Sequence, residues 1–109
     1  NALSQEQHTG VGGTTYGRPG RIKDSENVPT SELIDPETNE FYPAAVIADR
    51  FAGVGTQSSN RVLTYCGGGI AASATAFLLT VLGHTNVGLY DNSLSEWATD
   101  ESLPMEIGN

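Results

Sequence analysis

The sequence predicts an α/β fold in which helices flank a central, mainly parallel sheet. Residues 61–65 form a strand-like apolar run, residues 71–82 an apolar helical run rich in Ala and Leu, and residues 87–90 a second strand-like run. Strand, helix and strand in this order make a βαβ unit, whose two strands lie parallel. Both strands are apolar enough that we expect them to be buried.

The chain before this unit is predicted to form short elements joined by loops. Residues 4–7 have the form of a capping box, so a short helix is expected to begin there. Residues 10–20 carry five glycines and a proline, which is typical of an irregular loop. Residues 27–29 read as a short extended piece, after which Thr30 or Ser31 caps a brief turn.

A second helix is expected between these loops and the first strand of the unit. Residues 35–39 form a turn by composition. Pro43 suits the first position of a helix that continues through Phe51, and Gly53 or Gly55 would end it.

The chain after the second strand is predicted to contain one more short helical turn. Residues 91–92 close that strand, and Ser93 caps a turn that runs to Trp97. There are no internal repeats.

Composition limits the class of protein. The 109 residues suffice for one domain with one modest core, and 38% apolar with 17% charged residues is ordinary for a globular chain. The net charge of −8 argues against nucleic acid and anionic membranes as partners, and no apolar run is long enough to cross a bilayer. A single cysteine requires no oxidising compartment, so we expect a cytoplasmic location. The sequence begins at Asn1, without a methionine or a leader segment. We therefore expect this chain to be a piece of a longer polypeptide.

The lone cysteine, Cys66, is the strongest candidate for chemistry. It follows the first strand of the unit, and three glycines, residues 67–69, lead from it into the helix. Backbone N–H groups and the positive end of a helix aimed at one sulfur favour the thiolate, which is the nucleophilic form. The alternative interpretation is that a free cysteine is simply a small buried hydrophobic residue.

Two other interpretations of the loop are less favoured. Residues 67–72 fit a G-x-G-x-x-A dinucleotide fingerprint with Asp91 as the ribose-binding acid, but only 18 residues follow Asp91. A cysteine-dependent phosphatase needs an arginine to close the loop, whereas Ala72 stands there and no Arg or Lys follows Arg61. A soft nucleophile in a neutral, amide-lined loop suits sulfur transfer through a persulfide, with no metal or cofactor.

Several ordered motifs carry a resemblance to a known family. Residues 66–72 (C-G-G-G-I-A-A) resemble an active-site loop C-G-S-G-V-T-A, and residues 90–97 (Y-D-N-S-L-S-E-W) resemble Y-D-G-S-W-S-E-W. Three further stretches resemble segments of the same family: residues 20–22 taken together with 27–29, residues 51–54, and residues 103–106. The chain thereby resembles the rhodanese family, specifically the catalytic C-terminal domain of thiosulfate and mercaptopyruvate sulfurtransferases.

The resemblance implies a fold and a set of site residues. It implies one rhodanese-like domain over residues 1–109, with three layers and with the first strand missing from this chain. It implies that Cys66 forms the persulfide, and that the cradle around the transferred sulfur is made by Gly67, Gly68, Gly69, Ile70 and Ala71. The implied partners are a small sulfur donor of the thiosulfate or 3-mercaptopyruvate type, a thiol or cyanide-like acceptor and a second rhodanese-like domain.

Departures from the family pattern bear on the donor. Residues 1–4 (N-A-L-S) stand where the family has D-A-R-S, and Gln7 stands where related enzymes carry a substrate-binding arginine. Arg18 and Arg21, which cluster with Lys23, are candidate anion-binding groups in compensation, although such a cluster is also typical of a solvated loop. The alternative function is a module that relays sulfur to, or binds, a protein partner without turnover of small donors.

Overall fold

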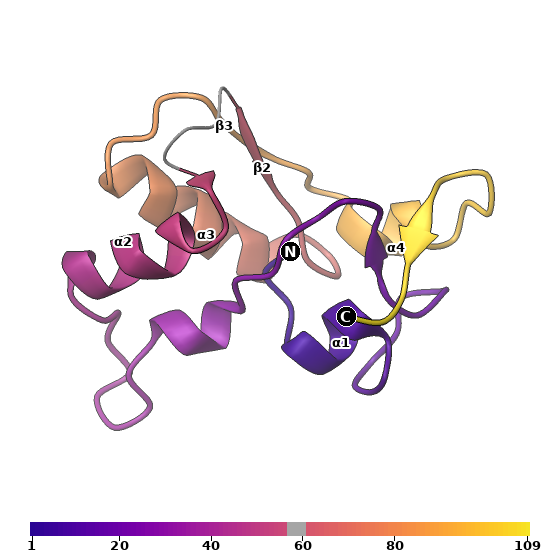
Figure 1. The fold of residues 1–109 in the computed structure, drawn as a ribbon, viewed down its shortest axis with the longest axis horizontal. Coiled ribbons are helices and arrows are strands. Elements are labelled where there is room, and N and C mark those ends of the chain that lie inside the picture. The colour runs from indigo at the N-terminus through magenta and orange to yellow at the C-terminus, as the bar shows by residue number, and fades with distance from the viewer. Residues whose placement is uncertain (57–60) are drawn as a thin grey trace.

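The computed structural model describes residues 1–56 and 61–109. Short helices and strands alternate along the described chain (Figure 1). In chain order they are α1 (Gln5–Thr9), β1 (Arg21–Ile22), the 3₁₀-helix η1 (Thr30–Leu33), α2 (Ala44–Ala52), β2 (Val62–Thr64), α3 (Ile70–Val81), β3 (Val87–Leu89), α4 (Ser93–Trp97) and β4 (Met105–Glu106).

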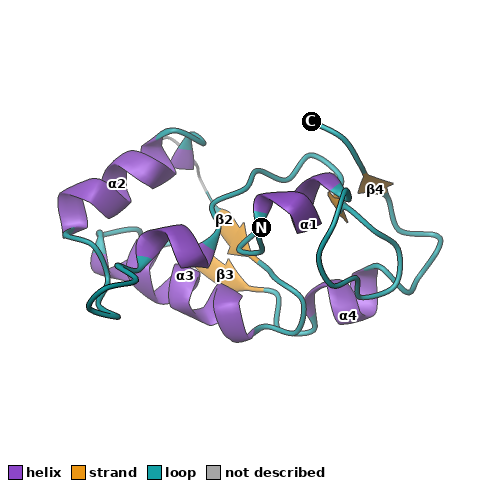
Figure 2. Cartoon of the chain, turned by 90° about the horizontal axis from the view of Figure 1, so that it is seen from below, coloured by secondary structure: helices purple, strands orange, loops and turns teal. Residues whose placement is uncertain are grey.

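The predicted βαβ unit is present. Strands β2 and β3 pair in parallel, with Leu63 opposite Gly88, and α3 connects them and packs against both. Figure 2 shows β2 and β3 between α2 and α3 on one side and α1, α4 and β4 on the other. The α/β class with a parallel sheet is therefore confirmed.

The expected burial is wrong for Leu63 in β2, which is 61% exposed, and for β3, where Leu89 is 39% exposed and Val87 and Gly88 are only partly buried. Successive residues of a strand point to opposite faces of the sheet. The face with Thr64 lies under α3, and Thr64 is 3% exposed, whereas the face with Leu63 has no comparable cover within the described residues. Within that part of the chain β2 and β3 pair only with each other, so the parallel sheet there has two strands.

The main core lies between α2, α3 and the η1 region. Its buried members come from segments far apart in the sequence and are Val28, Leu33, Ile47, Phe51, Leu78 and Leu79. Val62 and Val87 pack against this cluster from the sheet. The core thus fixes the position of α3, and with it the loop before that helix, which contains Cys66.

A second small sheet was not anticipated from the sequence. Strands β1 and β4 pair antiparallel, with Arg21 opposite Glu106. The phenolic oxygen of Tyr65 accepts a hydrogen bond from Ile22 N–H at 3.0 Å, which ties this sheet to the end of β2. The two sheets are therefore joined directly beside Cys66.

The helix boundaries agree with the predictions within a residue or two, but the caps of η1 and α4 differ. Ser4 caps α1 in a complete capping box, and Gly53 follows α2. Thr30 lies within η1 rather than capping it, because its hydroxyl contacts α3 instead, at the Ala71 carbonyl oxygen and Thr75 Oγ1. None of the described helices has the length and apolar character needed to cross a membrane.

Candidate active site

Cys66 lies in the loop between the end of β2 and the start of α3. Its side chain is 2% exposed, and Gly69 is the N-cap of α3. The helix has 12 residues, so its positive N-terminal end is directed at this loop. The predicted position of the cysteine at the carboxyl end of a parallel strand is therefore confirmed.

The loop favours the thiolate form of Cys66. The N–H of Gly69 donates a hydrogen bond to Sγ at 3.1 Å. Burial raises the pKa of the thiol, but hydrogen bonds to it more than offset this effect, so the pKa lies below the ordinary value. The backbone of Ala72, Gly69 and Gly68 and the Ser93 side chain lower this pKa.

The first turn of α4 holds the backbone of the loop. Ser93 Oγ accepts a hydrogen bond from Cys66 N–H at 3.0 Å, and Leu94 N–H donates to the Cys66 carbonyl at 3.1 Å. Ser95 donates to the Gly67 carbonyl from its N–H, at 2.9 Å, and from its hydroxyl, at 2.7 Å. In a trans peptide unit the N–H points opposite to the C=O. Fixing the Gly67 carbonyl against α4 therefore turns the next N–H, that of Gly68, toward the sulfur side.

Ser93 contacts the backbone of Cys66 instead of capping α4. It was expected to cap α4, but Asn92 occupies the N-cap position and makes no side-chain cap bond. Ser93 is completely buried with φ +51°, and its hydroxyl donates to the Tyr90 carbonyl at 2.7 Å while accepting from Cys66. A serine before a helical run normally signals a cap, and nothing in the sequence pattern distinguishes this buried contact from one.

The three glycines of the loop differ in what they accommodate. A Cβ atom at Gly67 would lie 2.0 Å from Tyr16 Cζ, and one at Gly69 would lie 2.5 Å from the Asp91 carbonyl oxygen. Gly69 also has φ +95°, a conformation that side chains disfavour. At Gly68 the nearest atom is Ser95 Oγ, at 4.0 Å. Only the middle glycine has room for a side chain.

The remaining cradle residues lie at the start of α3. Ile70 is 87% exposed, and Ala71 is half-buried with its carbonyl accepting from Thr30. The structure thus brings all the predicted cradle residues into one loop and helix start around Cys66.

Arg18 and Arg21 are both held by backbone carbonyls. Arg18 Nε donates a hydrogen bond to the Ala98 carbonyl at 3.0 Å. Its Nη2 lies within hydrogen-bonding distance of three more carbonyl oxygens, those of Trp97, Asp100 and Leu103. Arg21 Nη1 donates to the Gly108 carbonyl at 2.6 Å and to that of His8 at 3.3 Å. These bonds give both side chains a structural role, joining the loops before η1 to the end of the chain.

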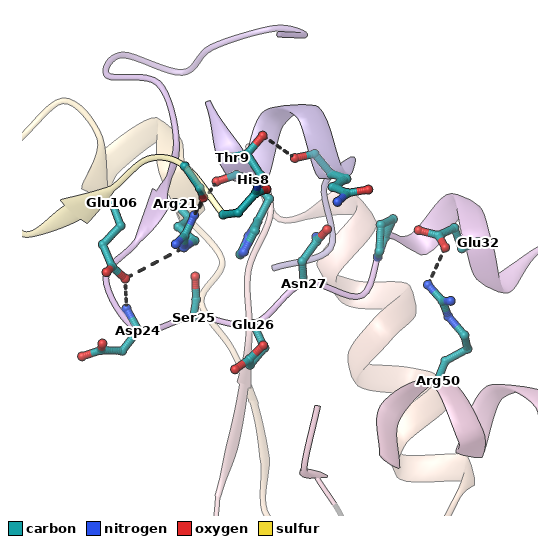
Figure 3. Close-up of a pocket in the computed structure, with 14 residues that line it drawn as sticks. His8, Thr9, Arg21, Asp24, Ser25, Glu26, Asn27, Glu32, Arg50 and Glu106 are labelled. Atoms are coloured by element: carbon teal, nitrogen blue, oxygen red, sulfur yellow. Dashed lines mark hydrogen bonds and ion pairs between the residues drawn. The ribbon is translucent and has the colours of Figure 1, made fainter. Parts of the chain in front are cut away.

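The cavity around Arg21 is separate from the loop of Cys66. It has a volume of about 690 Å³, and Cys66 is not among the residues that line it. Figure 3 shows two ion pairs among its lining side chains: Arg21 Nε lies 3.9 Å from Glu106 Oε1, and Arg50 pairs with Glu32. His8 also lines it, and burial lowers the pKa of that imidazole to about 4. No group of three or more His, Cys, Asp or Glu within residues 1–56 and 61–109 is arranged to hold a metal.

Comparison with known proteins decides the family. The family model of the rhodanese-like domain matches residues 6–100. The chain belongs to the rhodanese family. Residues 66–72, with Cys66 at their start, lie within the matched range.

Curated relatives carry sulfurtransferase names. The chain is 35% identical over 89 residues to thiosulfate/3-mercaptopyruvate sulfurtransferase 1, mitochondrial, of Arabidopsis thaliana, covering 82% of this chain and 23% of that protein. It is 36% identical over 93 residues to a putative thiosulfate sulfurtransferase of Mycobacterium tuberculosis strain H37Rv, covering 84% of this chain and 33% of that one. The chain therefore spans about a quarter to a third of the length of these relatives.

Solved structures confirm the rhodanese-like fold. The anaerobic ergothioneine biosynthesis enzyme of Chlorobium limicola superposes with a TM-score of 0.82 at 24% identity, covering 99% of this chain and 27% of that one. The Tum1 protein of Saccharomyces cerevisiae gives a TM-score of 0.80 at 22% identity, covering 100% of this chain and 40% of that one. At these identities the likeness concerns the fold alone.

Proposed function

We propose that this domain is a sulfurtransferase that carries sulfur as a persulfide on Cys66. The observation that carries the proposal is the Cys66 thiol itself, buried in a loop whose N–H groups lower its pKa. The names of the relatives support the same chemistry, and the small donors in those names, thiosulfate and 3-mercaptopyruvate, are the substrates proposed here.

The reaction runs in two displacements at sulfur. The Cys66 thiolate attacks the outer sulfur of thiosulfate, a Cys66 S–S bond forms, and the S–S bond of thiosulfate breaks with its electron pair leaving on sulfite. From 3-mercaptopyruvate the C–S bond breaks instead, and the carbon that keeps the electron pair takes a proton to give pyruvate. A thiolate or cyanide acceptor then attacks the outer persulfide sulfur, and Cys66 leaves as the thiolate.

The loop supports both steps through its backbone. N–H groups at the start of α3 face the sulfur, where they stabilise negative charge on the thiolate and on the persulfide. A thiol with a lowered pKa needs no neighbouring base to ionise it. Neither His8 nor His84 is therefore required for the attack.

A sulfur relay to or from a protein partner is the second candidate. The observation that favours it is that the described arginines bond within the chain: Arg18 and Arg21 to carbonyls, Arg50 to Glu32 and Arg61 to Asn86. A small anionic donor that approaches Cys66 would thus meet few cationic side chains that are not already bonded within the chain. A persulfide delivered on a protein surface needs no such cation.

A transfer assay separates the two candidates. The wild type and Cys66→Ser would be incubated with cyanide and either thiosulfate, 3-mercaptopyruvate or a persulfidated protein donor, and thiocyanate formation would be measured. Saturable turnover of a small donor by wild type alone supports the enzyme, and loading from the protein donor alone supports the relay. Turnover by Cys66→Ser would refute both, since both require the persulfide on Cys66.

A further inference from the structure

Asp91 follows β3 and lies beside the active-site loop. A Cβ atom built on Gly69 would lie 2.5 Å from the Asp91 carbonyl oxygen and 2.9 Å from its Oδ1. The residue is exposed, and its carboxylate forms no hydrogen bond or ion pair with the residues that the structure describes. The steps of the proposed sulfur transfer leave this charge without a role.

The carboxylate of Asp91 is close to the reacting sulfur. The N–H of Gly69 donates to Cys66 Sγ at 3.1 Å, and Asp91 Oδ1 lies on the other side of the same glycine. The covalent bonds of Gly69 then limit the distance between Oδ1 and Sγ to at most about 9 Å. Charges at such a distance still act on one another, because the screening length at about 0.1 M salt is about 10 Å.

The part of the loop that is open to solvent lies next to Asp91. Within residues 66–70 Gly68 and Ile70 are exposed, and the others are buried. The space beside Gly68 is open, since the nearest atom to a Cβ built there is 4.0 Å away. A reactant that reaches Cys66 past these two residues therefore also passes the carboxylate of Asp91.

Positive charge near this entrance is sparse. No Arg or Lys follows Arg61 in the sequence, so α3, α4 and the loop between β3 and α4 supply neither. The guanidinium of Arg18 bonds carbonyl oxygens at the far end of α4. The Asn1 ammonium interacts with Cys66, but burial lowers the pKa of that ammonium to about 6, so the group is largely uncharged at pH 8. Asp91 consequently makes the entrance to the loop negative at that pH.

We propose, on the basis of the proposed function, that Asp91 is a specificity-determining residue for the acceptor, and that it favours thiols that carry a positive charge close to the sulfur. The acceptor thiolate attacks the outer sulfur of the Cys66 persulfide. The S–S bond to Cys66 breaks with its electron pair on the Cys66 sulfur, and the acceptor leaves as a persulfide. The Asp91 carboxylate attracts a cationic acceptor and repels an anionic one without taking part in bond breaking.

The test compares the discharge of the persulfide by thiols of different charge. Wild type, Asp91→Asn, Asp91→Glu and Glu37→Gln are each loaded with sulfur and freed of donor. They are then mixed at pH 8 and low salt with cationic cysteamine, neutral 2-mercaptoethanol or anionic mercaptoacetate, and the rate of persulfide loss is measured. Each thiol is compared with itself across the four proteins, so differences in intrinsic reactivity cancel.

Glu37→Gln is the matched control for net charge. It removes one negative charge, as Asp91→Asn does, but from the exposed turn of residues 35–39, which Figure 1 shows well away from the loop before α3. Asp91→Glu keeps the charge beside the loop. Both variants are expected to discharge to the three thiols at the wild-type rates.

Asp91→Asn should slow discharge to cysteamine and speed discharge to mercaptoacetate, each about twofold or more, with the rate to 2-mercaptoethanol unchanged. Both effects should shrink in about 1 M salt, where the screening length falls to about 3 Å. The same change for all three thiols would indicate a structural role for Asp91, and that result or the absence of any change would overturn the proposal.

A second arm separates free aminothiols from protein acceptors, since a cysteine beside a lysine presents the same chemistry. Peptides with one cysteine flanked by lysines or by serines replace the small thiols. A preference for the lysine peptide that Asp91→Asn removes extends the selection to protein acceptors. A preference confined to cysteamine assigns it to free aminothiols.

A further measurement requires no sulfur transfer. Unloaded Cys66 is modified by a cationic thiosulfonate, 2-(trimethylammonium)ethyl methanethiosulfonate, and by an anionic one, 2-sulfonatoethyl methanethiosulfonate. The ratio of the two rates should fall about fourfold or more in Asp91→Asn, and an unchanged ratio would overturn the proposal. If neither donor loads sulfur, the proposed function has failed and acceptor selection with it, while this ratio still decides whether Asp91 sets the charge at the loop. Should Asp91→Asn melt at a lower temperature than wild type, Asp91→Ser replaces it in both measurements.

Discussion

At the scale of single residues, the chemistry of Cys66 depends on groups that are distant in sequence. Ser93 lies 0% exposed behind the loop and accepts the N–H of Cys66, and its hydroxyl contributes to the lowered pKa of the thiol. The backbone of Ser93 also has a φ of +51°, which is strained for a residue other than glycine. A backbone strain retained at a buried contact with the nucleophile indicates that the contact itself is what the fold maintains.

Two replacements of Ser93 separate the effect of its hydroxyl on Cys66 from the effect of its backbone strain on stability. In Ser93→Ala and Ser93→Gly alike the loss of the hydroxyl should raise the pKa of Cys66, so the pH at half-maximal iodoacetamide alkylation moves upward. Ser93→Ala also leaves the Cys66 N–H unpaired, at a cost of about 1–3 kcal/mol in the free energy of unfolding. Ser93→Gly should cost less because glycine adopts positive φ freely. An alkylation midpoint equal to wild type in both variants would contradict this role.

At the scale of elements, the active-site loop is held between the start of α3 and the start of α4. Gly69→Ala should destabilise the protein by about 1–3 kcal/mol, because alanine is unfavourable at φ +95° and its Cβ meets the Asp91 carbonyl. Gly68→Ala should change the free energy of unfolding by less than about 0.5 kcal/mol, because its space is open. Urea unfolding measures the free energy of unfolding of both variants. Equal losses of this free energy would contradict the difference in space and backbone conformation between Gly68 and Gly69.

The βαβ unit was predictable from sequence because its signals are local. An apolar run, three glycines and a helical run identify β2, the loop and α3, and the sequence therefore placed Cys66 correctly. Strands β1 and β4 were not predictable, since each has two residues and forms only by pairing across most of the chain.

The supporting contacts of the site were also beyond sequence reasoning. Ser93 reads as a helix cap, and Tyr16 lies in a glycine-rich loop without a motif. The cluster of Arg18 and Arg21 predicted anion binding from charge alone, whereas the structure engages both groups with carbonyl oxygens. Each of these roles depends on a tertiary contact that no local pattern encodes.

At the scale of the whole molecule, burial is uneven between the two faces of the parallel sheet. Leu79 on α3 is 0% exposed within the main core, whereas Leu63 on the other face is 61% exposed. Leu79→Ala should lower the free energy of unfolding by about 2–5 kcal/mol, and Leu63→Ala by no more than about 0.5 kcal/mol. Denaturant titrations of both variants test this, and a comparable loss at Leu63 would mean that its face is covered in solution.

The central claim is that Cys66 accepts one sulfur atom, and intact mass spectrometry tests it most directly. Wild type and Cys66→Ser would each be weighed before and after incubation with thiosulfate and, separately, with 3-mercaptopyruvate. The account predicts that wild type gains the mass of one sulfur atom with at least one donor, that a reductant reverses the gain, and that Cys66→Ser gains nothing. A folded wild type that gains no sulfur from either donor, or a Cys66→Ser variant that gains it equally, would contradict the account.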